Sequence, residues 1–268
     1  MIGAEQIKIN FENFNGVLEA NFKGERLKKL KTLTESLKER MMFAPASTKD
    51  WFNNAFPGGY LDHVLRVNKI ANQLHKLYAF HNANETYTGE ELNFVSLFSQ
   101  LGKLGDWENE YFQKNDSDWH VKNLGMVYKF NAEVPAMKIY DRTIFLLQDA
   151  GIKLSHNEYL AIRNQEGLFD ESNKFYFYSG QKETKFRTHL PLLIHQSIQT
   201  AQEIEYQAWS SGNPVVRSTK PANASKADKS LRKAKAIKEE NNPNFSKNTK
   251  SIIDSFFTDD IAHTKPTK

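Results

Sequence analysis

The spacing of apolar residues constrains the fold of this chain more than any other feature. Apolar residues recur at three- and four-residue steps through most of the first 209 residues, which is typical of amphipathic helices. Alternating runs are few, and only Phe175–Tyr178 is interpreted as a short strand or hairpin edge. Ser155 and Glu158 have the spacing of a capping box. The pattern therefore predicts an all-α fold with helices over residues 27–42, 61–78, 91–101, 135–150, 155–163 and 190–209.

Composition excludes several classes of protein. Among 268 residues, 39% are hydrophobic and 12% aromatic, which is enough to fill the core of one sizeable domain. The chain has no cysteine, so a disulfide scaffold, a thiolate zinc site and a cysteine nucleophile are all excluded. No run approaches the roughly 18 to 20 apolar residues of a membrane span, and residues 1–10 lack the features of a secretory signal. We expect a cytoplasmic protein without membrane contact.

Charge is distributed unevenly along the chain. Residues 216–250 contain ten Lys or Arg against three Asp or Glu, a net charge of +7, whereas the whole chain has a net charge of +4. The helical pattern ends near Ser210, and Gly212, Pro214 and Pro221 follow. We therefore expect a helical domain over residues 1–210, a flexible basic linker over 211–249, and a separate C-terminal peptide over 250–268 that restores a small apolar cluster.

Two segments carry a resemblance to a known family. The segment Phe56-Pro-Gly-Gly-Tyr-Leu-Asp-His63 resembles the opening of HD-domain phosphohydrolases, in the form found in exoribonuclease-associated domains and in small HD proteins of large tailed phages. Phe98-Ser-Gln-Leu-Gly-Lys-Leu-Gly-Asp106 resembles the helix that carries the His-Asp-x-Gly-Lys motif of that family. The likeness extends loosely over residues 40–208. It implies an HD-like helical bundle, and a host-cell cytoplasmic location if a phage encodes the chain.

The resemblance also implies which positions would hold metal. HD chemistry needs imidazole and carboxylate ligands that converge on one or two divalent ions. By the family pattern, His63 and His195 are the residual metal-ligand positions. The other positions are degenerate, because a hydroxyl, a neutral amide or an alkyl group binds transition metals weakly or not at all; they are Ser99, Gln100, Gln165 and Ile198.

These replacements predict an HD-like pseudoenzyme with no catalytic residues, no metal and no cofactor. On this hypothesis His63 and His195 are polar core residues with hydrogen bonds to backbone or water. The alternative is a divergent phosphohydrolase that uses a divalent transition metal on a nucleotide or nucleic-acid end, with His63 and His195 as remaining ligands. Substitute ligands are available, although none has a spacing that demands a site: His120, His156, His189, Asp62, Asp106 and Asp170.

The C-terminal peptide suggests a partner. Lys250-Ser-Ile-Ile-Asp-Ser-Phe-Phe257 resembles the sliding-clamp-binding peptide known as the PIP box, with Lys250 in place of Gln and with Ile253, Phe256 and Phe257 in register. On one helical turn these three apolar side chains form a compact plug that suits a surface pocket. The alternative is a short helix that folds back onto the body.

The basic linker suggests a second partner. Its cations suit salt-dependent, sequence-independent contact with a DNA backbone, and Lys229, Arg232, Lys233 and Lys235 are the candidate contacts. The alternative is a solvated linker whose charged residues serve only to keep it soluble. Together these features predict an inactive HD-like adaptor that tethers a replication, repair or late-transcription component to a DNA sliding clamp. The partner of the body is not identified by any motif.

Overall fold

A computed structural model describes residues 2–52, 54–83, 86–178, 183, 185–213, 215, 217 and 219. The chain divides into two units, Met1–Val215 and Val216–Lys268. The fold described here belongs to the first unit. The expected basic linker from residue 220 on and the whole expected C-terminal peptide lie outside the described residues.

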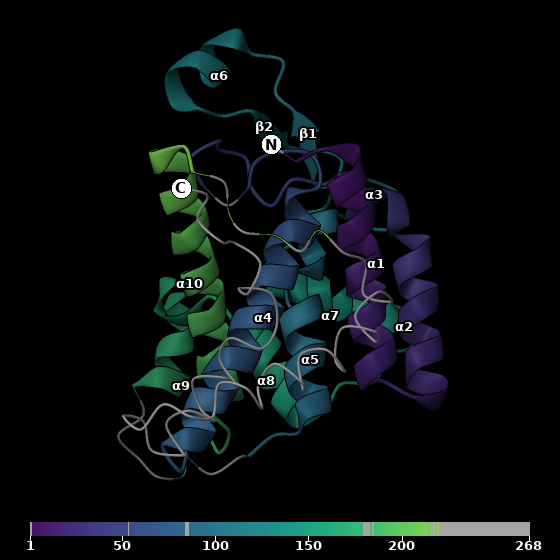
Figure 1. Cartoon of the computed structure of the whole chain (residues 1–268), viewed down its shortest axis with the longest axis vertical. Coiled ribbons are helices and arrows are strands. Elements are labelled where there is room, and N and C mark those ends of the chain that lie inside the picture. The colour runs from purple at the N-terminus through teal and green to yellow at the C-terminus, as the bar shows by residue number, and fades with distance from the viewer. Residues whose placement is uncertain are drawn as a thin grey trace, which may run out of the picture. The chain divides into compact units, whose positions relative to one another are not determined.

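The first unit is mostly helical, as predicted, and is organised around helix α4 (Gly59–Phe80). Helix α4 packs against α10 (Leu190–Ser211), α5 (Gly89–Phe98) and α1 (Ala4–Asn21). Figure 1 shows α4 and α5 in the middle of the bundle, with α10 on one side and α1 on the other. Nearly half of the residues of α4 are buried, because three neighbouring helices cover it. Among the described residues, no helix is long and apolar enough to cross a membrane.

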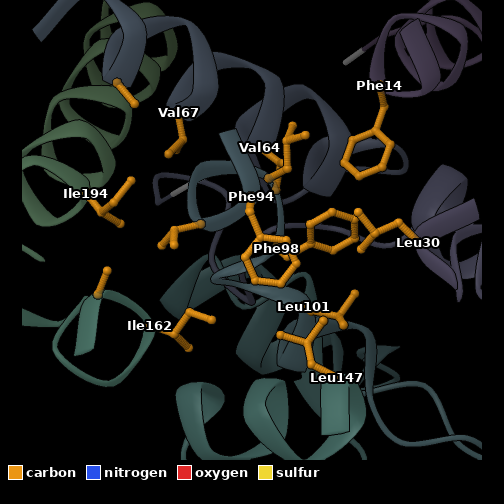
Figure 2. Packing of buried hydrophobic residues seen from close by; sticks show 14 of the residues in the cluster. Phe14, Leu30, Val64, Val67, Phe94, Phe98, Leu101, Leu147, Ile162 and Ile194 are labelled. Atoms are coloured by element: carbon orange, nitrogen blue, oxygen red, sulfur yellow. The ribbon is translucent and has the colours of Figure 1, made fainter. Parts of the chain in front are cut away.

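The hydrophobic core lies where α5 meets its neighbours. Phe94 and Phe98 are fully buried, with ring centroids 5.4 Å apart, and the Phe14 ring of α1 meets Phe98 edge-on at 5.6 Å. Figure 2 shows these rings surrounded by aliphatic side chains such as Val64 of α4 and Ile194 of α10. Burial of this kind stabilises a fold by about 1.5–3 kcal/mol per large side chain. The core therefore packs α4, α5 and α10 against one another.

The N-terminal region differs from the expectation in two ways. Helix α1 was not predicted, although Ile7, Phe11, Phe14 and Leu18 form a buried stripe at helical spacing. The single helix expected over residues 27–42 is two helices, α2 (Gly24–Ser36) and α3 (Lys38–Phe43). They meet at Leu37, whose φ of −103° and ψ of 10° depart from helical values.

The other predicted helices are present. Besides α4 and α10 they are α5, α7 (Ile139–Asp149) and α8 (His156–Arg163). The capping box at the start of α8 is confirmed, because the Ser155 hydroxyl accepts from the Glu158 backbone N–H and the Glu158 carboxylate accepts from the Ser155 backbone N–H. The 3₁₀ turn η1 (Leu101–Leu104) follows α5 and packs against α7. A Cβ at Gly102 would overlap the Ile139 carbonyl, so only glycine allows this close approach.

The prediction of a strand at Phe175–Tyr178 is wrong. Most of that segment forms the short helix α9 (Lys174–Phe177), which follows two 3₁₀ turns, η2 (Gly167–Phe169) and η3 (Glu171–Asn173). A run of aromatic residues favours a strand only when it can pair with another strand. The described strands lie elsewhere: β1 (Phe112–Lys114) pairs antiparallel with β2 (Tyr128–Phe130), and α6 (Asp118–Leu124) connects them. This hairpin and α6 project from the bundle in Figure 1.

Candidate functional site

A buried polar centre lies at the start of helix α4. Gly58 has a φ of +82°, which glycine adopts without strain, and it turns the chain into the helix. A Cβ at Gly59 would overlap the Asn54 carbonyl, so the preceding loop lies directly against the first turn. As a result Asp62 and His63, one turn further on, both point into the protein and are buried.

His63 is completely buried between two polar side chains. Its Nδ1 lies 2.9 and 3.0 Å from the two carboxylate oxygens of Glu205 on α10, and its Nε2 lies 3.2 Å from Nε2 of Gln100. A carboxylate only accepts hydrogen bonds, so Nδ1 carries the proton. Nε2 of the neutral ring then accepts from the Gln100 amide. Both nitrogens of His63 therefore have partners inside the protein.

The guanidinium of Arg66 links the His63–Glu205 pair to a second carboxylate, that of Asp62. Arg66, one turn along α4 from Asp62, donates to Glu205 Oε1 at 2.6 Å and to Asp62 Oδ2 at 3.0 Å. Asn54 Nδ2 also donates to Asp62 Oδ2, at 2.8 Å. Burial alone would lower the pKa of Arg66, but the carboxylates of Asp62 and Glu205 outweigh it and the pKa is raised. The network therefore ties α4 to α10 through charge-assisted hydrogen bonds.

Lys103 of η1 adds a second cation to this centre. Burial lowers the pKa of its ammonium to about 8, against the opposing effect of the nearby Glu166 and Glu205 carboxylates. Glu166 is exposed to solvent, so the charged groups of the centre itself are two carboxylates, Asp62 and Glu205, and two cations, Arg66 and Lys103. Charge in the buried centre is balanced when His63 is neutral, which is the condition under which buried charges are tolerated.

Of the four positions predicted to be degenerate, Gln100 contacts His63 directly, and Gln165 contacts the neighbouring Ser99. Ser99 and Gln100 are buried at the end of α5. The Ser99 carbonyl accepts from Gln165 Nε2 at 2.8 Å, so the segments expected to match two different ligand sites are in contact. Ile198 is a buried member of the hydrophobic core on α10.

His195 has a different environment from His63. Its Nδ1 lies 2.8 Å from the backbone carbonyl of Gln165, and its ring lies against Gly167, where any Cβ would overlap it. The two histidines thus have separate partners. The expectation of core histidines bonded to backbone or water therefore holds only in part, because the buried His63 has side-chain partners and His195, which does contact a backbone carbonyl, is only half-buried.

The donors present do not suit a divalent transition-metal ion. At His63 the nitrogen that would bind a metal accepts from Gln100, and the neighbouring family positions supply a hydroxyl, amides and an alkyl group. Among the described residues, no three His, Cys, Asp or Glu side chains are arranged to hold a metal. Of the substitute ligands considered, Asp62 pairs with Arg66, and Asp170 accepts from Lys138 and Tyr140.

The centre still has unused hydrogen-bonding capacity. Four buried oxygens of the segments at 99–100 and 164–165 have no hydrogen-bond partner among the described residues: Ser99 Oγ, Gln100 Oε1, Asn164 Oδ1 and Gln165 Oε1. Buried oxygens in folded proteins nearly always have a partner, which is ordered water where no protein group is near. These segments can therefore accept hydrogen bonds from water or from a small polar ligand.

Sequence reasoning missed the residue that organises the centre, Glu205. It lies seven residues after Ile198 on the same face of α10, in a stripe with Ile194 and Ala201 that is otherwise apolar and buried. A carboxylate in such a stripe signals a buried acid, which requires a cationic or hydrogen-bonding partner. Arg66, at helical spacing from Asp62, was the corresponding signal on α4.

The candidate residues of the tail lie outside the described residues. This applies to the clamp-binding positions and to the DNA-contact positions alike: Lys250, Ile253, Phe256 and Phe257, and Lys229, Arg232, Lys233 and Lys235. Comparison of the chain with protein-family models, with curated proteins and with solved structures found no match in any of the three.

Proposed function

We propose that this chain is a catalytically inactive HD-like adaptor, whose C-terminal peptide tethers a replication, repair or late-transcription component to a DNA sliding clamp. One observation supports the inactive body above all others: His63 is held between Glu205 and Gln100, so its metal-binding nitrogen is already engaged. Metal-dependent phosphoester hydrolysis needs free ligands at this position. The retained Gly58, Gly59 and Gly102 serve the packing of the bundle.

The clamp-binding part of the proposal is supported by the sequence of the tail. By their spacing in the sequence, Ile253, Phe256 and Phe257 would share one side of a helical turn if the peptide formed one on binding, and burial of each side chain would contribute about 1.5–3 kcal/mol. Ordering of the peptide offsets part of this gain, so we expect micromolar affinity. The +7 charge of residues 216–250 would add a salt-sensitive contact with the encircled DNA.

A specific observation favours the second candidate, a divergent phosphohydrolase. Lys103 and the unpaired oxygens of Ser99, Gln100 and Gln165 leave the centre able to bind a polar group. On this alternative His63 and His195 would be remaining ligands and Glu205 a third donor. It requires Gln100 to release His63, which is a rearrangement of the buried network.

Calorimetric titration of the full chain with the sliding clamp from the same genome tests the adaptor. We expect micromolar binding that is abolished by the double change Phe256→Ala and Phe257→Ala. Phe245→Ala is the matched control, because it removes an aromatic ring from the same tail outside the motif. The absence of any heat with the wild-type chain, or equal binding by the double variant, would refute the clamp assignment.

The proposed contact with DNA is tested by a second series of titrations, in which the sliding clamp is loaded on DNA. Replacement of Lys229, Arg232, Lys233 and Lys235 by Ser should weaken only the DNA-dependent part of the affinity. That part should also decrease as salt increases, whereas the contribution of Phe256 and Phe257 should persist. A loss of affinity in the absence of DNA would contradict the role given to the linker cations.

A further inference from the structure

An open apolar pocket lies beside His195. It has a volume of about 330 Å³ and is lined by Leu192 and His195 of α10, Leu168 and Phe169 of η2, and Phe177 of α9. Phe169 is 79% exposed and Leu168 is 42% exposed. Large apolar side chains that line a concave surface and remain in contact with water favour the binding of another apolar group.

The pocket contains one polar atom whose role can be deduced. His195 Nδ1 lies 2.8 Å from the Gln165 carbonyl, which only accepts, so Nδ1 carries the proton of the neutral ring. Nε2 is therefore a hydrogen-bond acceptor, and among the described residues it has no hydrogen-bond partner. Movement of the ring is restricted, because it lies against Gly167 and its centroid is 6.5 Å from that of Phe169 and 6.3 Å from that of Phe177.

Size and chemistry together define the ligand. The volume is near the lower end for ligand pockets and suits one aromatic ring system. The Phe169 and Phe177 rings offer edge and face contacts to such a ring. The five lining residues include no cation and no carboxylate, so a charged group would lose hydration there without compensation. A single acceptor in an apolar wall selects a ring that carries one donor, as indole and phenol do.

We propose that this pocket binds a Trp or Tyr side chain of a partner protein, with the indole N–H or phenol O–H donating to His195 Nε2. A protein segment is favoured over a free aromatic compound because the short helix α9, which contributes Phe177 to the pocket, also carries exposed aromatic residues. Phe175 of α9 and Tyr178 at its end are 63% and 70% exposed, and they would contact residues that flank the inserted ring. This inference supplies a docking site for the body, and it does not depend on clamp binding by the tail.

The test uses the full chain and blocked tripeptides of Ala-X-Ala, with X as Trp, Tyr or Phe. Binding at millimolar concentration is followed by NMR, through the shifts of the His195 ring and of the lining residues. We expect the Trp and Tyr peptides to bind about fivefold more tightly than the Phe peptide, the factor given by one net hydrogen bond of about 1 kcal/mol. The His195 Nε2 resonance should move with the Trp and Tyr peptides only.

Two variants separate specific docking from non-specific apolar association. Phe169→Ala should abolish binding, whereas Phe145→Ala, which removes a 49% exposed ring on α7, should leave it unchanged.

Other outcomes would overturn the proposal. Equal affinity of the three peptides would exclude the role of His195 Nε2. Binding of free indole without binding of the Trp peptide would assign the pocket to a small aromatic ligand. Concentration-dependent dimerisation that Phe169→Ala abolishes would assign it to a second copy of this chain. Failure here leaves the clamp titration unaffected, so the two proposals fail separately.

Discussion

Replacement of Lys103 by Met should change how the stability of the protein depends on pH. The pKa of the Lys103 ammonium falls from 10.5 to about 8 on folding, mainly because burial removes hydration. Between pH 8 and 10.5 the folded protein has lost this proton while the unfolded chain retains it. The unfolded state then binds more protons, so the free energy of unfolding rises with pH across this window.

The size of the effect follows from the change in pKa. One pKa unit corresponds to about 1.4 kcal/mol, so the wild type should gain up to about 3 kcal/mol over this window relative to Lys103→Met. Access of solvent to this partly exposed side chain reduces the value. Lys103→Arg should also lack the rise, because arginine keeps its charge throughout. Lys28→Met, at an exposed position on α2, is the matched surface control and should retain it.

Urea unfolding followed by circular dichroism at pH 7 to 10 measures these free energies. Nitrogen NMR of the Lys103 side chain in the folded protein gives the pKa directly. Parallel stability curves for the wild type and Lys103→Met across the whole range would refute the placement of this ammonium beside Glu205 and Glu166. So would a Lys103 titration midpoint at the value of a free lysine.

Two further predictions concern the network and the domain boundary. Glu205→Ala should lower the free energy of unfolding by about 3–5 kcal/mol, because it leaves Arg66 and His63 buried without this partner. Glu203→Ala, on the exposed face of α10, should cost little, and equal losses for the two variants in urea unfolding would contradict the network. Deletion of residues 211–268 should leave the body folded with nearly the stability of the full chain, because the residues of the core cluster all precede residue 202. A lost or broadened thermal transition of the shortened chain would show that the tail is required for folding.

The part of the fold that could be predicted is the part that local sequence patterns determine. Apolar spacing identified α4, α5, α7, α8 and α10, and the Ser155 capping box marked where α8 begins, because these signals depend on neighbours within one or two turns. The same spacing is present in α1 but was overlooked. The aromatic run at Phe175–Tyr178 led to the wrong prediction of a strand, because a segment with high strand propensity forms a strand only where another strand can pair with it.

The candidate site was less predictable because its contacts are distant in sequence. His63 was singled out from its motif, but its partner Glu205 lies 142 residues away on α10, and nothing local to either residue pairs them. The family pattern placed the closing carboxylate at Ile198, where the structure has a core residue. A carboxylate two helical turns later faces the same side, so the position of the acid has to be read from the face of the helix and not from motif spacing.

Elemental analysis of the full chain, purified without chelators, tests the central claim most directly. With both nitrogens of His63 engaged by Glu205 and Gln100, we predict far less than one equivalent of Fe, Mn, Ni or Zn per chain, and the same metal content in His63→Ala. About one tightly bound ion or more per chain, lost in His63→Ala together with phosphoesterase activity, would contradict the inactive body and establish a metal-dependent hydrolase.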